Sequence, residues 1–196
     1  MLGGIARRVQ GQSGDTVADR KPETMTEIKR KQFTLREWRP GDAESLAQHA
    51  NNVKVSRNLH DAFPHPYTRA DADSWIKQTS TATSGMIFAI VVDGQAVGGI
   101  GIHPGKDVER RTAAIGYWLG EPYWGRGITT EALQAMTEHV FAVFDFARLE
   151  AYVFEWNLAS ARVLEKAGYT REARLKKKVT KEGRTLDCFL YARVRE

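Results

Sequence analysis

The chain has 196 residues, of which 42% are hydrophobic, 27% charged and 10% aromatic. This composition predicts a soluble globular protein, and no apolar run approaches the roughly 20 residues that span a bilayer. The single cysteine, Cys188, excludes an internal disulfide and lies in an alternating stretch typical of a packed strand, which favours a cytoplasmic protein with a buried thiol. The net charge of +5 leaves two kinds of anionic partner open, a nucleic acid and a phosphate-rich cofactor.

The chain divides into a tail and a region of regular patterns. Residues 1–24 are rich in Gly, Arg, Asp, Gln and Ser and have no apolar period, so we expect a flexible N-terminal tail. Residues 25–196 contain no second linker and predict a single domain.

Between residues 33 and 103 the apolar pattern predicts a strand, two helices and a hairpin. Asp42 is a favourable N-cap for the first helix, and Thr68 with Asp71 has the spacing of a capping box at the start of the second. Asp93-Gly94 is a strong signal for a two-residue hairpin turn. In chain order the predicted elements are strand Phe33–Trp38, helix Ala43–Ala50, helix 68–79, strand Met86–Val92 and strand Ala96–His103.

The second half of the chain predicts one crossover and a final hairpin. The helix of the crossover carries Leu133, Met136 and Val140 on one face, Gly168 is placed to end the next helix, and Glu182-Gly183 is the hairpin turn. The elements are strand Arg111–Leu119, helix Ile128–Phe146, strand Leu149–Trp156, helix Leu158–Ala167, strand Arg174–Thr180 and strand Thr185–Val194. The pattern predicts an α+β fold, with a mixed, mostly antiparallel sheet, one parallel strand pair and flanking helices.

One turn in this pattern carries chemistry. A strand ends at Leu119, a turn with a proline follows, and Gly125 and Gly127 precede the long helix. The first helix amides, on Ile128, Thr129 and Thr130, have no partners within the helix and carry the positive end of its dipole, which suits a pyrophosphate. Arg126 adds a full positive charge. The spacing alone also fits an ordinary strand-to-helix turn in which the glycines only relieve strain.

Four segments together resemble the GNAT superfamily of N-acetyltransferases, most closely the branch that acetylates the N-terminal alanine or serine of ribosomal proteins. The likeness covers roughly residues 33–194. It implies a twisted sheet with a splayed parallel pair, acetyl-CoA as co-substrate, no metal, and direct attack of a primary amine on the thioester. The segments are Gly116–Leu119, Trp124–Ala132, Asn157–Ser160 and Leu164–Tyr169.

The resemblance also implies site residues. The peptide N–H of Leu119 is expected to polarise the thioester carbonyl, and the Ser160 hydroxyl to protonate the departing sulfur. The family's phosphate motif, Gln/Arg-x-x-Gly-x-Gly/Ala, has its first position at Trp124 and its last at Thr129, so two of its three defined positions differ here. The expected cofactor-binding residues are Trp118, Leu119, Trp124, Gly125, Arg126, Gly127, Ile128, Thr129, Thr130, Asn157 and Ser160.

The general base and the acceptor stay open. Glu155, His103, Glu109 and Glu121 are all candidates for the base, and the irregular stretch Asn51–Tyr67 is expected to wall the acceptor site. The acceptor is a protein N-terminus or a small amine such as an amino acid, polyamine or antibiotic. A non-catalytic module that binds CoA or nucleic acid is the remaining alternative, although the cations form no single stripe. We expect no membrane partner, and a monomer and a homodimer are both open.

Overall fold

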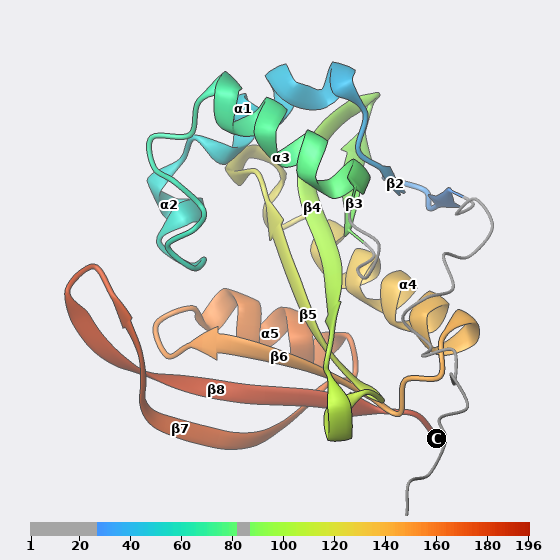
Figure 1. Ribbon diagram of the computed structural model, residues 1–196, viewed down its shortest axis with the longest axis vertical. Coiled ribbons are helices and arrows are strands. Elements are labelled where there is room, and N and C mark those ends of the chain that lie inside the picture. Colours follow the sequence, from blue (N-terminus) through green and yellow to red (C-terminus); the bar gives the residue numbers. More distant parts are fainter. Residues whose placement is uncertain (1–26, 82–86) are drawn as a thin grey trace, which may run out of the picture.

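The computed structural model describes residues 27–81 and 87–196, so the predicted tail, residues 1–24, lies outside the described residues. One eight-stranded sheet forms its centre, in the order β1-β2-β3-β4-β5-β6-β8-β7 (Figure 1). The strands are β1 Ile28–Lys29, β2 Thr34–Glu37, β3 Ile87–Val92, β4 Gln95–Pro104, β5 Thr112–Leu119, β6 Arg148–Phe154, β7 Thr170–Lys181 and β8 Arg184–Val194. The helices are α1 Ala43–Ala50, α2 Val53–Ser56, α3 Arg69–Thr81, α4 Ile128–Val143 and α5 Leu158–Lys166.

The β5–β6 pair is the one parallel pair of the described sheet, as the crossover through α4 requires. The two strands are paired only from Thr112 with Arg148 to Ala114 with Glu150. Beyond that point β5 stays with β4 and β6 stays with β8, so the strand backbones diverge as a wedge, and the region between them is termed the opening (Figure 1). The predicted α+β sheet with one splayed parallel pair is therefore confirmed.

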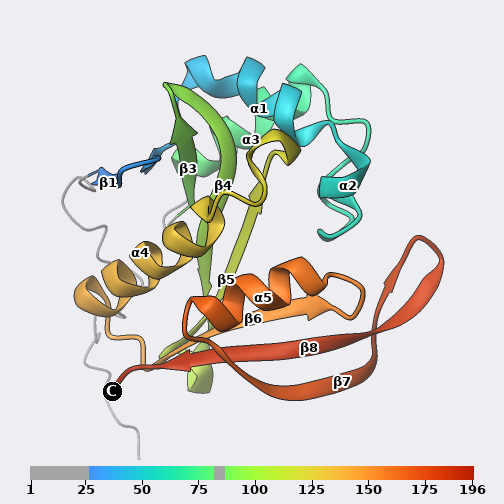
Figure 2. The same cartoon turned by 180° about the vertical axis from the view of Figure 1, so that it is seen from behind.

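Helices cover the two faces of the sheet and enclose separate hydrophobic clusters. The larger cluster lies under α4 and α5 and includes Leu119, Met136 and Leu164, all of them buried. The smaller lies under α1 and α3 and includes Leu46 and Ile76. Figure 2 shows α4 and α5 together on one side, with α1 and α3 packed at the other end of the sheet. Side chains alternate along β5, so successive residues beside the opening face opposite sides of the sheet.

Local signals explain several element boundaries. Thr68 and Asp71 form a reciprocal capping box, in which the Thr68 amide donates to Asp71 Oδ2 at 2.7 Å and the Asp71 amide donates to Thr68 Oγ1 at 3.2 Å. Both residues of the Asp93-Gly94 turn have positive φ, as a type I′ hairpin turn requires. Gly168 has φ 84° and follows α5 in the left-handed conformation typical of a helix end.

Several details differ from the sequence expectations, and strand β7, for example, begins at Thr170 rather than at Arg174. Helix α4 ends at Val143 rather than Phe146, because Phe144 adopts extended backbone and packs its ring against that of Phe146. Asp42 makes no side-chain cap to α1 but forms a buried pair with Arg36, at 2.7 Å. The stretch expected to be irregular contains the short helix α2, which Asn52 caps by accepting from the Lys54 amide at 2.8 Å.

The edge strand β7 contains a wide bulge at the run of three lysines. Leu175 pairs with Cys188 and Val179 with Leu186, so the three consecutive lysines between Leu175 and Val179 face Asp187 alone. The Asp187 carboxylate holds the bulge, since it accepts from the Lys177 amide at 2.9 Å and from Arg174 Nε at 2.6 Å. Such bulges bend a strand and increase its twist. The β7–β8 hairpin curves accordingly toward the side of α2 (Figure 1).

Candidate active site

The turn between β5 and α4 has the geometry of an anion site. Gly125 and Gly127 have φ of 74° and 81°, and a Cβ built on either would meet no atom within 4 Å. Gly127 is the N-cap of α4, and its carbonyl accepts the first helical bond, from the Glu131 amide at 3.1 Å. The amides of Ile128, Thr129 and Thr130 are therefore left without helical partners, next to an open space at the positive end of a helix of 16 residues.

Trp124 and Arg126 have different places in this turn. The Trp124 indole N–H donates to the Leu119 carbonyl at 2.7 Å, so the one donor of this side chain joins the turn to the end of β5. The residue is 44% exposed. The Arg126 guanidinium lies 5.3 Å from the centre of the Tyr123 ring and belongs to an exposed residue. Its charge is therefore available beside the helix amides.

The register of β4 and β5 decides where the peptide groups of β5 point. The amide of Gly120 donates to the Val97 carbonyl at 2.8 Å, and pairs alternate along an antiparallel ladder between bonded and non-bonded. Leu119, opposite Gly98, is at a non-bonded position, so its N–H points away from β4 and into the opening. Trp118, opposite Gly99, is at a bonded position and directs its peptide N–H to β4. The same alternation directs the Tyr117 N–H into the opening.

Ser160 lies at the start of α5, on the other side of this opening. Asn157 caps the helix, because its Oδ1 accepts from the Ser160 amide at 3.2 Å. The Ser160 hydroxyl is 2.9 Å from the hydroxyl of Tyr117, which reaches across from β5 and also donates to the Ser160 carbonyl at 3.3 Å. Burial raises the pKa of Tyr117 far above its ordinary value, so the phenol stays protonated. Sequence reasoning missed Tyr117, because 43 residues separate it from Ser160.

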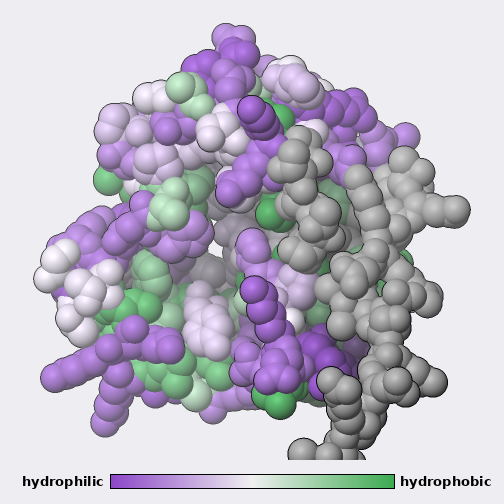
Figure 3. All heavy atoms as spheres, in the orientation of Figure 1, coloured by the Kyte–Doolittle hydropathy of each residue, from purple (hydrophilic) through white to green (hydrophobic). Residues whose placement is uncertain are grey.

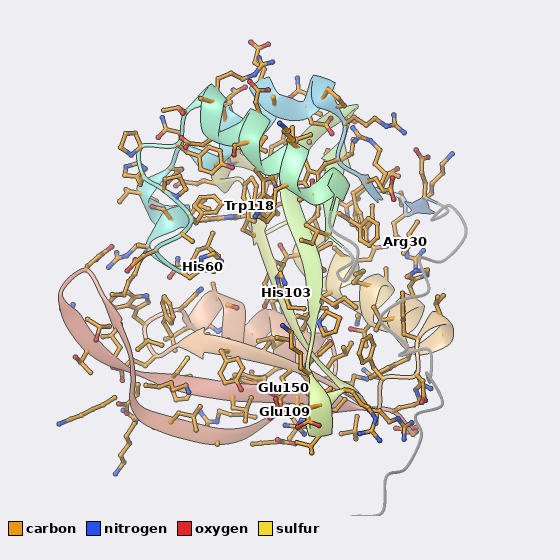
Figure 4. All side chains as sticks on the ribbon, viewed as in Figure 1. Arg30, His60, His103, Glu109, Trp118 and Glu150 are labelled. Atoms are coloured by element: carbon orange, nitrogen blue, oxygen red, sulfur yellow. The ribbon has the colours of Figure 1, made fainter. Side chains whose placement is uncertain are left out.

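The face opposite α4 and α5 carries a second set of groups. Trp118, Gly116 and His103 share this face through the β4–β5 register, and Phe63 of the α2–α3 segment packs on Trp118 with ring centres 5.7 Å apart. A Cβ on Gly99 would meet the Trp118 indole nitrogen at 2.9 Å, so the glycine-rich β4 makes room for this tryptophan. Figure 4 shows Trp118 toward the helical end, His103 below it, and Glu109 and Glu150 where β5 and β6 meet.

The candidates for the general base differ in their surroundings. The Glu155 carboxylate accepts from Arg174 and from the Asp187 amide, both at 3.2 Å. That of Glu121 accepts from Asn52 at 2.8 Å and from Lys54 at 2.5 Å, which lower its pKa. Glu109 is an exposed residue in the short turn after β4. Desolvation and the nearby charge of His60 lower the pKa of His103, so its imidazole is neutral at pH 7.

Residues 27–81 and 87–196 hold no group of three or more His, Cys, Asp or Glu side chains that could bind a metal ion. None of their helices combines the length and the apolar character needed to cross a membrane. Cys188 is buried and unpaired, as its position in an alternating strand predicted.

These features define the class of the protein: an α+β enzyme with a splayed parallel strand pair and an anion-binding turn before a crossover helix. The family model described as the acetyltransferase (GNAT) domain matches residues 32–170, and the chain belongs to this family. It is an acetyl-CoA-dependent N-acetyltransferase, and the open turn, the unpartnered helix amides and the free N–H groups of β5 fit this co-substrate. The resemblance seen in the sequence is thus confirmed.

The relatives carry similar names. The chain is 27% identical over 163 residues to an uncharacterized N-acetyltransferase p20 of Bacillus licheniformis, covering 82% of this chain and 91% of that protein. It is 31% identical over 108 residues to a ribosomal-protein-serine acetyltransferase of Escherichia coli, covering 55% and 60% of the two chains. A solved structure of Mycobacterium smegmatis RimJ with CoA-disulfide is 28% identical, with a TM-score of 0.73 and coverage of 83% and 81%.

Proposed function

We propose that this enzyme acetylates the α-amine at a protein N-terminus, with Leu119 and Ser160 acting on the thioester between β5 and β6. One observation carries the assignment of these residues: the Tyr117 hydroxyl joins the Ser160 hydroxyl across the opening at 2.9 Å, two residues before Leu119 on the same strand. The acceptor class is supported by the name of the Escherichia coli relative, which acts on ribosomal-protein serine.

The turn holds the phosphates in this proposal. The amides of Ile128, Thr129 and Thr130 donate to the pyrophosphate, and Gly125 and Gly127 let it approach the backbone. Arg126 adds a charge-assisted bond. Trp124 acts indirectly, because its indole holds the turn against Leu119. Asn157 has a capping bond to Ser160 and keeps an amide nitrogen for the pantetheine arm.

Leu119 and Ser160 act on the two sides of the thioester C–S bond that breaks, Leu119 on the carbonyl and Ser160 on the sulfur. The Leu119 N–H donates to the carbonyl oxygen as negative charge develops there, a contact typically worth about 3–4 kcal/mol in other enzymes. Ser160 donates to the leaving sulfur. The Tyr117 phenol, which stays neutral, holds the Ser160 oxygen in place. Trp118, whose N–H is turned toward β4, contributes its side chain to the wall of the acceptor side.

No carboxylate is required as the base. Glu155 and Glu121 are held by cations, and His103 lies opposite Ala114, five residues before Leu119 on β5. That is about 16 Å along the strand at 3.3 Å per residue, so His103 takes a proton only through water. An α-amine has a pKa of about 7.7–8.0 and is partly neutral when it arrives. The rate is therefore expected to follow the ionisation of the acceptor amine.

A screen of acceptors tests the proposal. Release of the CoA thiol is followed with acetyl-CoA and, in turn, N-terminal Ser and Ala peptides, free amino acids, a polyamine and an aminoglycoside. We expect the highest kcat/KM with the peptides. The second candidate, a small-amine acetyltransferase, would show peptides no better than free amines. The absence of thiol release with every amine, from a folded protein that binds acetyl-CoA, would refute the catalytic assignment.

A further inference from the structure

Two segments far apart in sequence meet over the open end of the β5–β6 wedge. The Lys181 ammonium at the end of β7 lies 2.6 Å from the Asp61 carboxylate, 120 residues away in the chain. A guanidinium nitrogen of Arg57, just after α2, lies 3.7 Å from a carboxylate oxygen of Glu182 in the hairpin turn. The bulge at Asp187 bends the hairpin toward α2 and so allows these contacts.

Trp156 lies between these segments, and two cationic side chains lie against its ring. The guanidinium carbon of Arg57 is 5.1 Å from the centre of its indole ring, and that of Arg184 is 5.7 Å from it. Stacking on an aromatic ring fixes a guanidinium while leaving its N–H groups free to bind a carboxylate or phosphate. The Trp156 indole N–H is itself buried and has no acceptor among the described residues. Arg57, Trp156 and Arg184 thus form one cluster. Within this cluster Arg57 already faces Glu182, so the guanidinium N–H groups left to bind an anion are chiefly those of Arg184.

The cluster lies about as far along β6 from the paired part of the parallel strands as Leu119 lies along β5. Ala114 and Glu150 are the last paired residues of the parallel strands, and Leu119 and Trp156 follow them by five and six residues. The cluster thus lies across the opening from Leu119. Phe154, whose ring is 6.1 Å from that of Trp156, has the parity of Glu150 and so faces the same side as Trp118. This is the face opposite α4, α5 and the phosphate turn. The space-filling view shows this part of the surface hollowed, between the helical end and the β6–β8 end (Figure 3).

Near the cluster, cationic side chains outnumber the carboxylates that can pair with them. Four carboxylates lie on the α2–α3 segment, on the turn after β5, just after β6 and in the β7–β8 turn, and each is paired with a cation: Asp61–Lys181, Glu121–Lys54, Glu155–Arg174 and Glu182–Arg57. Arg184 is exposed and has no carboxylate partner within residues 27–81 and 87–196. A polyamine or aminoglycoside would meet no unpaired carboxylate on these segments, whereas an anionic group would meet Arg184.

We infer that the acceptor carries an anionic group close to its reacting amine, and that Arg184, with Arg57 beside it, binds this group against Trp156. The inference rests on the proposed function and narrows it to acidic acceptors. Two sources share this chemistry: an N-terminal segment whose next residues are acidic, and a small amine with its own carboxylate or phosphate.

Matched acceptors test the inference. Three short C-terminally amidated peptides begin with serine and continue with glutamate, glutamine or lysine residues, and free serine is compared with serinamide. We expect kcat/KM for the glutamate peptide to exceed that for the lysine peptide by about fivefold, the upper end of the range for one exposed ion pair. The difference should shrink as salt is raised to about 0.5 M. A preference for serine over serinamide that exceeds the peptide preference would identify the small-molecule source.

A charge reversal assigns the effect to its residue. Arg184→Glu should abolish or invert the preference with an unchanged KM for acetyl-CoA. Arg171→Glu makes the same change of charge at the opposite end of the hairpin, on an exposed residue, and should keep the preference. Equal rates for the three peptides, a preference for lysine, or the same loss in both variants would overturn the inference while leaving the proposed function intact. Failure of every amine to react would overturn both.

Discussion

Removal of the Ser160 hydroxyl is the sharpest perturbation of the proposed chemistry. Ser160→Ala deletes one oxygen, whose described contact is the Tyr117 hydroxyl at 2.9 Å. The cap of α5 survives, because Asn157 accepts from the Ser160 backbone amide, and Tyr117 still donates to the Ser160 carbonyl. The buried anchors of this helix, Ala161 and Leu164, are unchanged. The loss of stability should therefore stay below about 1 kcal/mol.

The kinetic effect should be much larger than the structural one. General acid catalysis typically contributes 10²–10⁴-fold, so kcat should fall by at least about tenfold with little change in the KM for acetyl-CoA. A thiol has a pKa near 8.5, so the deficit should shrink as pH rises above that value and the thiolate leaves unaided. The assay is CoA thiol release between pH 6.5 and 9.5. Ionisation of the acceptor amine affects both enzymes alike and cancels in the ratio of wild-type to variant rates. Tyr117 does not ionise in this range, because burial raises its pKa, so the pH trend of that ratio reports the leaving group.

Tyr117→Phe is the companion variant. It keeps the ring in the core and removes the hydroxyl, whose contacts are the Ser160 hydroxyl and the Ser160 carbonyl. The contact with the Ser160 hydroxyl is the one that positions the acid, so kcat should fall by about fivefold, as expected for one hydrogen bond of about 1 kcal/mol. The double variant should be no slower than Ser160→Ala, since the phenol acts through the serine. A Ser160→Ala enzyme with wild-type kcat at pH 7 would refute this reasoning and reduce Ser160 to a residue of the helix.

Three further predictions concern the turn, the core and the tail. Gly127→Glu should abolish acetyl-CoA binding, measured by calorimetry. Gly127→Ala is the control, because it has the same backbone strain at a φ of 81° but free space for its methyl group, and it should still bind acetyl-CoA. Equal affinities of the two variants for acetyl-CoA would contradict the phosphate site. Burial raises the pKa of Asp42, but the bonds from Arg36 and the Arg39 amide outweigh it and lower the pKa overall. The pair therefore stabilises the fold above about pH 4, and this contribution is lost as the pH falls below that value. Asp42→Asn should lower the free energy of unfolding, measured in urea, by about 3–5 kcal/mol at pH 7 and by less at pH 3. A loss of stability that does not depend on pH would be inconsistent with the ion pair. A chain that begins at Met25 should keep its turnover and Tm, and a large loss of either would place residues 1–24 in the fold or the site.

Local chemistry explains which parts of the fold the sequence predicts. The Thr68–Asp71 box, the Asp93-Gly94 turn and Gly168 each act within a few residues, so their effect can be read from neighbours in the chain. The crossover geometry follows from the order of strands and one helix. The long helix was predicted to run three residues too far, because nothing in the local pattern shows that Phe144 turns outward to pack on Phe146.

The candidate site is predictable only in part. The turn from Trp124 to Thr130 lies within one segment, so its glycines and helix start appear together in the sequence. The contact between Tyr117 and Ser160 depends on how β5 and α5 pack, and the pair of Lys181 and Asp61 depends on a bend set by Asp187. The pairing of Glu155 with Arg174, which removes a candidate base, also depends on strand register. Such contacts are products of tertiary packing and have no sequence pattern of their own.

The most direct test of the account is the fate of the acetyl group. A peptide with N-terminal serine is incubated with acetyl-CoA and enzyme, the CoA thiol is titrated, and the product is sequenced by tandem mass spectrometry. The account predicts one acetyl group on the α-amine for each thiol released, and no product from the same peptide with a blocked N-terminus. Acetylation of a lysine side chain in the blocked peptide, or thiol release without an acetylated peptide, would contradict it.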